Sequence, residues 1–322
     1  MPWRKILRIV YPTDLITIAY ILLTGIFIFF SALKLNDVAV HLTTRVFLVG
    51  VISLFIYLDY TYPSKLVRFV RHFYPLALLC YFYPETDYLN NIFFPNLDPW
   101  VANLEVTIFG GHPSIWFSEY FPWRWFSELM NLGYFSFYIL IFILCYKIYR
   151  DDYEDFSISV FIICMSFYIY YFIFIFFPVA GPQFYFAPPD NLLPDGYLFS
   201  KAVAIVHEMG ERPTAAFPSS HVGIMCLLLV LASKYAPKLL KWYIPIGIIL
   251  ILSTVYIKAH YAIDVIAGVL TVPTLYWISI QAYNVIVQGL SQEIKVQLVY
   301  EKIRVWVNDI SEKIRQRQNP FR

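Results

Sequence analysis

Apolar runs long enough to cross a lipid bilayer recur along this chain, and they constrain its fold more than any other feature. A membrane-spanning helix needs about 20 mostly apolar residues. The composition agrees, because 59% of the 322 residues are hydrophobic and only 14% are charged, whereas soluble domains carry about 25% charged residues. The sequence therefore predicts an all-α, polytopic membrane bundle of about six to eight transmembrane helices.

One of the apolar segments is weaker than the others. The clear runs are residues 11–35, 41–60, 131–149, 157–177, 219–234, 242–256 and 261–285. The weaker run, 73–94, is interrupted by Pro84, Glu85 and Asp87, which predicts a broken or half-buried helix. An ionisable group inside a membrane indicates function, but Glu85 is equally well explained as the end of the helix. Both interpretations stay open here.

Changes in composition divide the chain into three predicted parts. Residues 1–72 form an N-terminal transmembrane hairpin with a basic connector, residues 73–285 a membrane-embedded domain, and residues 286–322 a tail. Within the second part, residues 95–130 are rich in tryptophan and predict short amphipathic pieces at the membrane interface. In the tail, apolar residues recur every three or four positions among lysines and arginines. This pattern predicts a basic amphipathic helix on the membrane surface or against a partner helix, with a solvated terminal helix as the alternative.

The distribution of positive charge predicts the orientation. With eight spans, 18 of the 24 lysines and arginines fall on one side of the membrane. The positive-inside rule then places both termini in the cytoplasm and the loop 178–217 on the extracytoplasmic side. We expect an integral protein of the bacterial inner membrane. The polar groups described next should lie at the outer face of that membrane.

Two histidines stand where polar loops turn into predicted helices. His221 begins one helix, and His260 precedes another, with Asp264 four residues further on. Only one antiparallel span separates the two helices, so both helix starts face the same membrane surface. Residues four apart share a helix face, and a carboxylate on one imidazole nitrogen leaves the other as a nucleophile or base.

The groups around the histidines predict a phosphate site. Ser219 and Ser220 offer hydroxyl and N–H groups at a helix start, where anions bind, and Arg212 and Lys258 supply positive charge. A lone histidine at a helix start is more often a cap, but here two histidines and a carboxylate occur together. A metal site is the competing chemistry, because His-x-x-x-Asp is also ligand spacing; no third ligand is evident, so no metal is expected.

These residues resemble a known family. Phe-Pro-Ser-Ser-His at 217–221 and Ser-Thr-x5-His-x3-Asp at 253–264 are similar to the second and third motifs of the type 2 phosphatidic acid phosphatase superfamily. The resemblance implies a six-helix lipid-phosphatase-type core in which His260 attacks phosphorus and Asp264 orients it. It also implies that His221 protonates the leaving oxygen, while Ser219 and Ser220 hold phosphate oxygens. Compared with the general motifs, Ser220 replaces a glycine, Thr254 replaces an arginine, and the first motif is not intact around Arg212.

These departures point to one branch of the superfamily. Thr254, Tyr256, His260, Tyr261 and Asp264 are spaced as in the inositol phosphorylceramide synthase branch, and the loop 178–184, which contains Gln183, resembles a proline-rich loop of that branch and its bacterial relatives.

The branch resemblance implies a lipid phosphotransferase that moves a phospho-headgroup, such as phosphoinositol, between lipids through a phosphohistidine. A lipid phosphate phosphatase that releases phosphate to water is the alternative, and a non-catalytic lipid-binding or transport protein a further one. We expect membrane lipids as substrates, Arg212, Lys258 and Gln183 among the phosphate-binding residues, and no cofactor or nucleic-acid partner. The sequence makes no prediction of the oligomeric state.

Overall fold

The computed structural model describes residues 10–210 and 212–318 of the chain, with the side chains of all of these except Met209 and residues 291–318. This part of the chain consists of helices joined by turns and loops and contains no strand. Its helices are α2 (Pro12–Phe30), η1 (Ala32–Lys34), α3 (Val38–Thr61), α4 (Lys65–Asn90), α5 (Asp98–Phe109), α6 (Pro113–Tyr120), α7 (Arg124–Asp151), α8 (Tyr153–Phe176), α9 (Pro182–Tyr185), α10 (Phe199–Gly210), α11 (Ser220–Tyr235), α12 (Pro237–Tyr256) and α13 (Ala262–Gln318).

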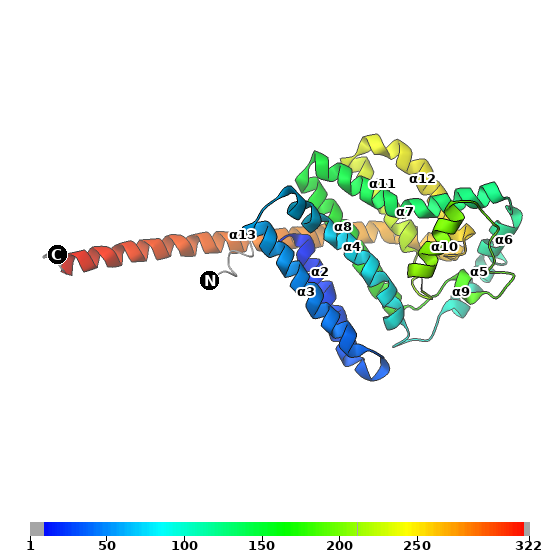
Figure 1. The fold of residues 1–322 in the computed structure, drawn as a ribbon, viewed down its shortest axis with the longest axis horizontal. Coiled ribbons are helices and arrows are strands. Elements are labelled where there is room, and N and C mark those ends of the chain that lie inside the picture. The colour runs from blue at the N-terminus through cyan, green and yellow to red at the C-terminus, as the bar shows by residue number, and fades with distance from the viewer. Residues whose placement is uncertain (1–9, 211, 319–322) are drawn as a thin grey trace.

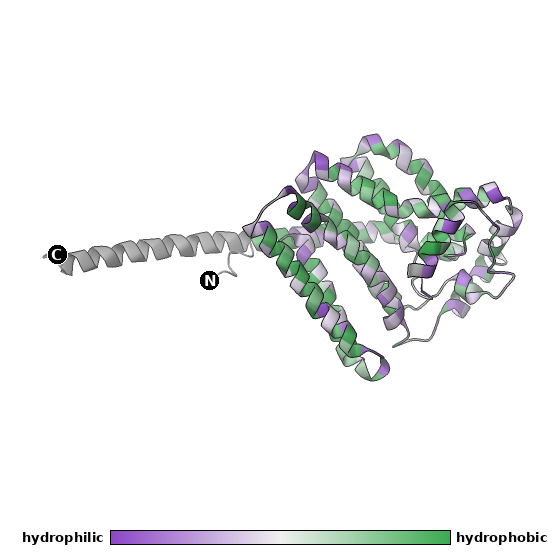
Figure 2. Cartoon of the chain, in the orientation of Figure 1, coloured by the Kyte–Doolittle hydropathy of each residue, from purple (hydrophilic) through white to green (hydrophobic). Residues whose placement is uncertain are grey.

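The long helices form the predicted membrane bundle. In the described part of the chain, six are long and apolar enough to cross a membrane: α2, α3, α7, α8, α12 and the portion of α13 that ends at Leu290. Figure 2 shows hydrophobic residues along these helices and hydrophilic residues concentrated at the turns between them. The prediction of an all-α polytopic membrane protein is therefore confirmed.

Helix α8 forms the centre of the bundle. In its most apolar window 72% of the residues are buried, and it packs against α2, α4, α7, α11 and α13. Tyr168 of α8 stacks on Tyr20 of α2 with a ring-centroid distance of 4.5 Å, and its hydroxyl lies 3.0 Å from that of Thr17. A helix that is apolar on every face is suited to such a central position.

Helix α4 differs from the sequence prediction. Residues 73–94 were expected to form a broken or half-buried helix after a basic connector, but α4 is not broken: it is continuous from Lys65 to Asn90 and passes through Pro75 and Pro84. The interpretation of Glu85 as a helix end is wrong, because Glu85 lies within α4. Its carboxylate accepts hydrogen bonds from both terminal nitrogens of Arg45 in α3, at 2.9 and 2.8 Å. This buried ion pair compensates the charge, so the helix continues.

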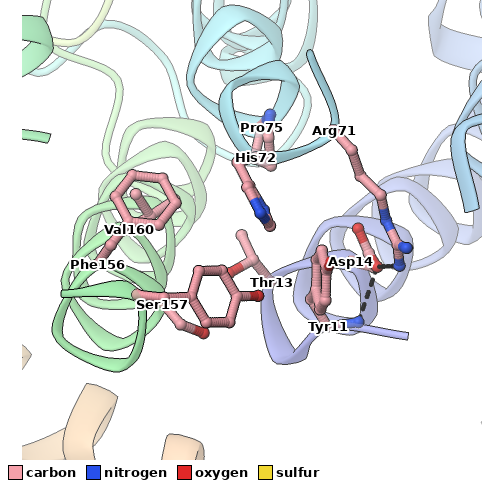
Figure 3. Close-up of a pocket in the computed structure, with 10 residues that line it drawn as sticks. Tyr11, Thr13, Asp14, Arg71, His72, Pro75, Phe156, Ser157 and Val160 are labelled. Atoms are coloured by element: carbon pink, nitrogen blue, oxygen red, sulfur yellow. Dashed lines mark hydrogen bonds and ion pairs between the residues drawn. The ribbon is translucent and has the colours of Figure 1, made fainter. Parts of the chain in front are cut away.

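A second buried ion cluster joins α2, α3 and α4 at the opposite end of the bundle from the short helices. The Arg71 guanidinium donates to Asp14 at 2.8 Å and to Asp59 at 2.7 Å. Figure 3 shows Arg71 and the main-chain nitrogen of Tyr11 converging on Asp14. The adjoining pocket has a volume of about 10 Å³, which accommodates at most one water. We therefore assign this cluster a structural role in joining the N-terminal hairpin to α4.

The last span and the tail form one helix. Helix α13 runs without interruption from Ala262 to Gln318 (Figure 1), so its backbone has no boundary at residue 286. The predicted amphipathic pattern of the tail concerns side chains beyond residue 290, which lie outside the described residues, and residues 319–322 are not described at all.

The short helices α5, α6, α9 and α10 gather at one end of the bundle (Figure 1). Helices α5 and α6 occupy the tryptophan-rich segment that was expected to form short amphipathic pieces. Trp100 and Trp116 remain exposed. The starts of α11 and α13 lie at the same end, because α12 runs antiparallel between them, and this arrangement brings the two histidine-containing stretches together.

Candidate functional site

The beginning of α11 is attached directly to the beginning of α13. The Ser219 side chain caps α11 by accepting a hydrogen bond from the Val222 N–H at 3.3 Å, and the Ser219 N–H donates to the Asp264 carbonyl at 3.0 Å. Close approach of the helices depends on Gly268, where an added Cβ would lie 2.5 Å from the Ser219 carbonyl oxygen. The glycine that follows the second histidine stretch therefore permits the contact that unites the site.

The two predicted histidines lie in direct contact. Nδ1 of His221 is 3.2 Å from Nε2 of His260, and the rings meet edge to face with centroids 5.4 Å apart. The other face of His221 packs on Tyr134 and Phe137 of α7, with centroid distances of 4.8 and 4.6 Å. His260 is only 2% exposed, and the member of the pair that lines a cavity is His221.

A main-chain carbonyl fixes the tautomer of His260. Its Nδ1 lies 2.7 Å from the Ala216 oxygen, and because a carbonyl only accepts hydrogen bonds, Nδ1 carries the proton. In the neutral ring, Nε2 then keeps its lone pair and directs it toward His221. This is the arrangement that a histidine nucleophile requires.

The position of Asp264 differs from the sequence expectation. Its Oδ2 lies 3.6 Å from Nδ1 of His260, which is an ion-pair distance rather than a hydrogen bond, and the same oxygen accepts the Tyr261 N–H at 2.7 Å. Its Oδ1 makes no hydrogen bond to a described residue. The Asp264 carboxyl group therefore lies beside the ring and caps α13, while the Ala216 carbonyl holds the ring directly.

A cavity of about 600 Å³ leads to the histidine pair, a size within the range of ligand pockets. Ser220 and His221 form its polar end. The rest of its wall is mostly apolar and comes from α4, α7, α8 and α10, including Phe73, Ala77, Leu79, Ile141, Phe142 and Phe167. Such a wall is suited to hydrocarbon chains.

The polar end of the cavity also offers backbone donors. The N–H groups of Ser220 and His221 form no hydrogen bond with any described residue. They stand in the first turn of α11, a helix of 16 residues, whose N-terminus carries partial positive charge. Free N–H groups at such a helix end are suited to phosphate oxygens.

Lys258 faces away from this cavity. It has a positive φ of 63°, and its side chain lines a separate pocket of about 230 Å³ together with Ser118, Glu119 and Asp190. There the ammonium group donates to the Leu192 carbonyl, and burial lowers the pKa of Lys258. The structure therefore does not bring the Lys258 charge to the histidine pair.

The remaining predicted phosphate ligands lie in loops around the site. The Gln183 N–H, in α9, donates to the Lys258 carbonyl at 2.9 Å, which ties the loop 178–183 to the second histidine stretch. Arg212 is exposed in the segment leading to Ala215. The neighbouring Pro213 carbonyl accepts from Asn90 of α4 at 3.4 Å, so this segment lies against the end of α4 beside the cavity.

The sequence interpretation missed two acidic residues of α5. Asp98 and Glu105 are both fully buried, at 0% exposure, and contact the segments that flank His260. Both lie on one helix face with Val101 and Ala102, so a signal existed: acids seven residues apart on the buried face of a short helix. In the described residues, no group of three or more histidine, cysteine or acidic side chains is arranged to hold a metal ion.

Comparison with known families agrees with this geometry. Residues 100–278 match the PAP2 superfamily, a span of more than half of the 322 residues that includes both histidine stretches. The chain belongs to the PAP2 superfamily. This PAP2 protein is therefore an enzyme of the phosphatase/phosphotransferase class, embedded in a membrane that supplies its lipid substrates. No curated protein matches the chain significantly, and no solved structure does.

Proposed function

We propose that this PAP2 enzyme transfers a phospho-headgroup from one lipid to another through a phosphohistidine on His260. The observation that carries the proposal is the contact of His260 Nε2 with His221 at the polar end of a cavity of about 600 Å³. The proposal assigns catalysis to residues 73–285 and treats the hairpin 1–72 and the tail 286–322 as flanking parts.

In the first step Nε2 of His260 attacks phosphorus, a P–N bond forms, and the P–O bond to the leaving group breaks. A protonated His221 donates its proton to the leaving oxygen. Because Nδ1 of His221 lies only 3.2 Å from Nε2 of His260, the His221 ring has to move aside as the phosphate enters. The negative charge of Asp264 stabilises the positive charge that His260 acquires.

In the second step an acceptor hydroxyl attacks phosphorus and the P–N bond breaks. His221, now neutral, takes the hydroxyl proton as general base, which returns both histidines to their initial protonation states. The Ser220 and His221 N–H groups, together with the Ser219 and Ser220 hydroxyls, stabilise the phosphate oxygens as charge develops. Exposed Arg212 supplies positive charge at the cavity mouth, whereas the main-chain hydrogen bond between Gln183 and Lys258 holds the surrounding loops together.

The apolar wall of the cavity supports a lipid donor, and the burial of His260 supports transfer to a lipid alcohol over transfer to water. The resemblance to the inositol phosphorylceramide synthase branch supports a phosphoinositol-type headgroup. The positive-inside distribution of lysine and arginine supports an extracytoplasmic site, with both termini in the cytoplasm of a bacterial cell.

The test uses the full-length protein reconstituted in vesicles that contain phosphatidylinositol with either ceramide or a diacylglycerol whose acyl chains differ from those of the phosphatidylinositol. We expect a new phosphoinositol lipid and an acid-labile phosphoenzyme, both lost in His260→Ala. His72→Phe is the matched control, since it replaces a buried histidine that lies among aromatic rings beside the Arg71 cluster and does not line the cavity. In parallel vesicles that contain phosphatidic acid, release of free phosphate, with no phosphoinositol transfer in the first vesicles, would establish the phosphatase alternative. Absence of both product and phosphoenzyme in the wild type, with lipid binding that His260→Ala leaves unchanged, would establish the non-catalytic one.

A further inference from the structure

Helix α5 contributes two buried carboxylates that have no lysine or arginine partner among the described residues. Asp98 accepts three hydrogen bonds: from the Ala180 N–H at 2.6 Å, the Gly181 N–H at 2.8 Å and the Tyr261 hydroxyl at 2.9 Å. Glu105 accepts the Ala262 N–H at 2.7 Å and lies 3.1 Å from Nδ1 of His112. Burying a carboxylate is unfavourable unless hydrogen bonds compensate, and here main-chain groups provide most of that compensation.

The loop held by Asp98 is wedged between the two histidine stretches. Gly181 has a φ of 100°, and a Cβ there would lie 2.8 Å from the Ala259 oxygen and 3.2 Å from Cβ of Ala216. Two residues before Gly181 in the same loop, the Val179 carbonyl accepts the Ala216 N–H at 3.0 Å. The loop therefore sets the position of Ala216, whose carbonyl holds Nδ1 of His260.

The same carboxylates act on the other side of His260. Tyr261 follows His260 directly and is anchored by its hydroxyl to Asp98, while the next residue, Ala262, is anchored by its N–H to Glu105. Helix α5 thus fixes the backbone after His260 and, through the loop, the carbonyl that binds the ring. Both contacts determine where Nε2 points.

We propose that Asp98 is a positioning residue that, with the support of Glu105, sets the orientation and tautomer of His260 through the loop 179–181 and Tyr261. The inference rests on the proposed role of His260 as the nucleophile. Asp98 touches no reactant; it acts through Ala216 and Tyr261. The carboxylate is required because it accepts from two N–H groups and a hydroxyl at once, which an amide does less well, since its NH2 group only donates.

The test compares wild type, Asp98→Asn and the exposed control Asp195→Asn as full-length protein in vesicles, with rates normalised to folded protein. We expect kcat of Asp98→Asn to fall about 10- to 100-fold, as for a misplaced reacting group, with KM changed less than about threefold. Asp195→Asn stays at wild-type kcat. Nitrogen-15 NMR of labelled histidine, assigned with His260→Ala, is expected to show a single Nδ1–H tautomer in wild type and a mixture in Asp98→Asn.

Tyr261→Phe is the second variant, and it tests the positioning role of Asp98 if Asp98→Asn fails to fold. It removes one of the three hydrogen bonds to Asp98, and we expect kcat to fall several-fold with the same tautomer change. Two results in whichever variant folds would together overturn the positioning role. They are a wild-type kcat per folded molecule and an unchanged tautomer of His260. Retained turnover by His260→Ala would instead overturn the proposed function, so the two failures are distinguishable.

Discussion

At the residue scale, the spacing between α11 and α13 depends on the absence of one methyl group. Gly268→Ala would place a Cβ 2.5 Å from the Ser219 oxygen, and such overpacking costs about 1–3 kcal/mol. The displacement would also separate His221 from His260, so we expect lower thermal stability and reduced turnover together. The control is Gly289→Ala on the same helix, where no atom lies within 4 Å. Replacing this glycine inside a helix by alanine is expected to stabilise the folded protein by about 0.5–1 kcal/mol. Equal effects of the two substitutions on stability would contradict the steric explanation.

Lys258 allows a pH-dependent test of its position. Burial lowers the pKa of this ammonium group in the folded protein, so between that lowered pKa and the unfolded value of about 10.4 the unfolded chain binds more protons. Stability must then rise with pH across this window. We expect the wild type to gain thermal stability relative to Lys258→Met as the pH is raised from about 7 to about 10.

The activity of the same variant distinguishes two roles for Lys258. If its ammonium remains in the pocket with Leu192, turnover of Lys258→Met stays within a few-fold of wild type. A loss of more than about tenfold in kcat, with a stability difference independent of pH, would instead support the phosphate-binding role predicted from the sequence.

At the scale of elements, α4 continues through Glu85 because Arg45 of α3 neutralises the charge of that carboxylate. Glu85→Gln would leave the Arg45 guanidinium, which is 5% exposed, without its counter-charge, and breaking a buried pair in this way costs about 3–5 kcal/mol. We expect a large drop in the thermal unfolding temperature. The double substitution Arg45→Met with Glu85→Leu should recover most of the lost thermal stability, since neither charge of this pair then remains buried. Asp87→Asn on the same helix is the control. If it lowered the unfolding temperature as much as Glu85→Gln does, the structural role of the Arg45–Glu85 pair would be contradicted.

The same helix shows what the sequence could predict. The clear apolar runs became helices because hydrophobic length is a local property, and the histidine pair was predictable because each histidine opens a helix at a known side of the bundle. The course of α4 was not, because the partner of Glu85 lies 40 residues away. Asp98 was missed for the same reason: its partners are main-chain N–H groups and a hydroxyl 82, 83 and 163 residues away.

At the scale of the whole molecule, the cavity between α4 and α7 predicts selectivity for long hydrocarbon chains. Ala77→Trp would fill part of this cavity without touching the histidines. We expect turnover of long-chain lipids to fall about tenfold or more, as when a substrate is misplaced, with turnover of a short-chain, water-soluble analogue nearly unchanged. Leu66→Trp, at a 72% exposed position of the same helix, is the control. Equal losses for both chain lengths would show that the cavity does not hold the chains.

The hydrogen bond from His260 to the Ala216 carbonyl has a consequence for how such an enzyme changes over evolutionary time. The acceptor belongs to the main chain, and every amino acid at position 216 carries the same carbonyl, so side-chain replacement there leaves the acceptor in place. Substitutions that alter the cavity wall would therefore leave this hydrogen bond, and with it the Nδ1–H tautomer of His260, in place.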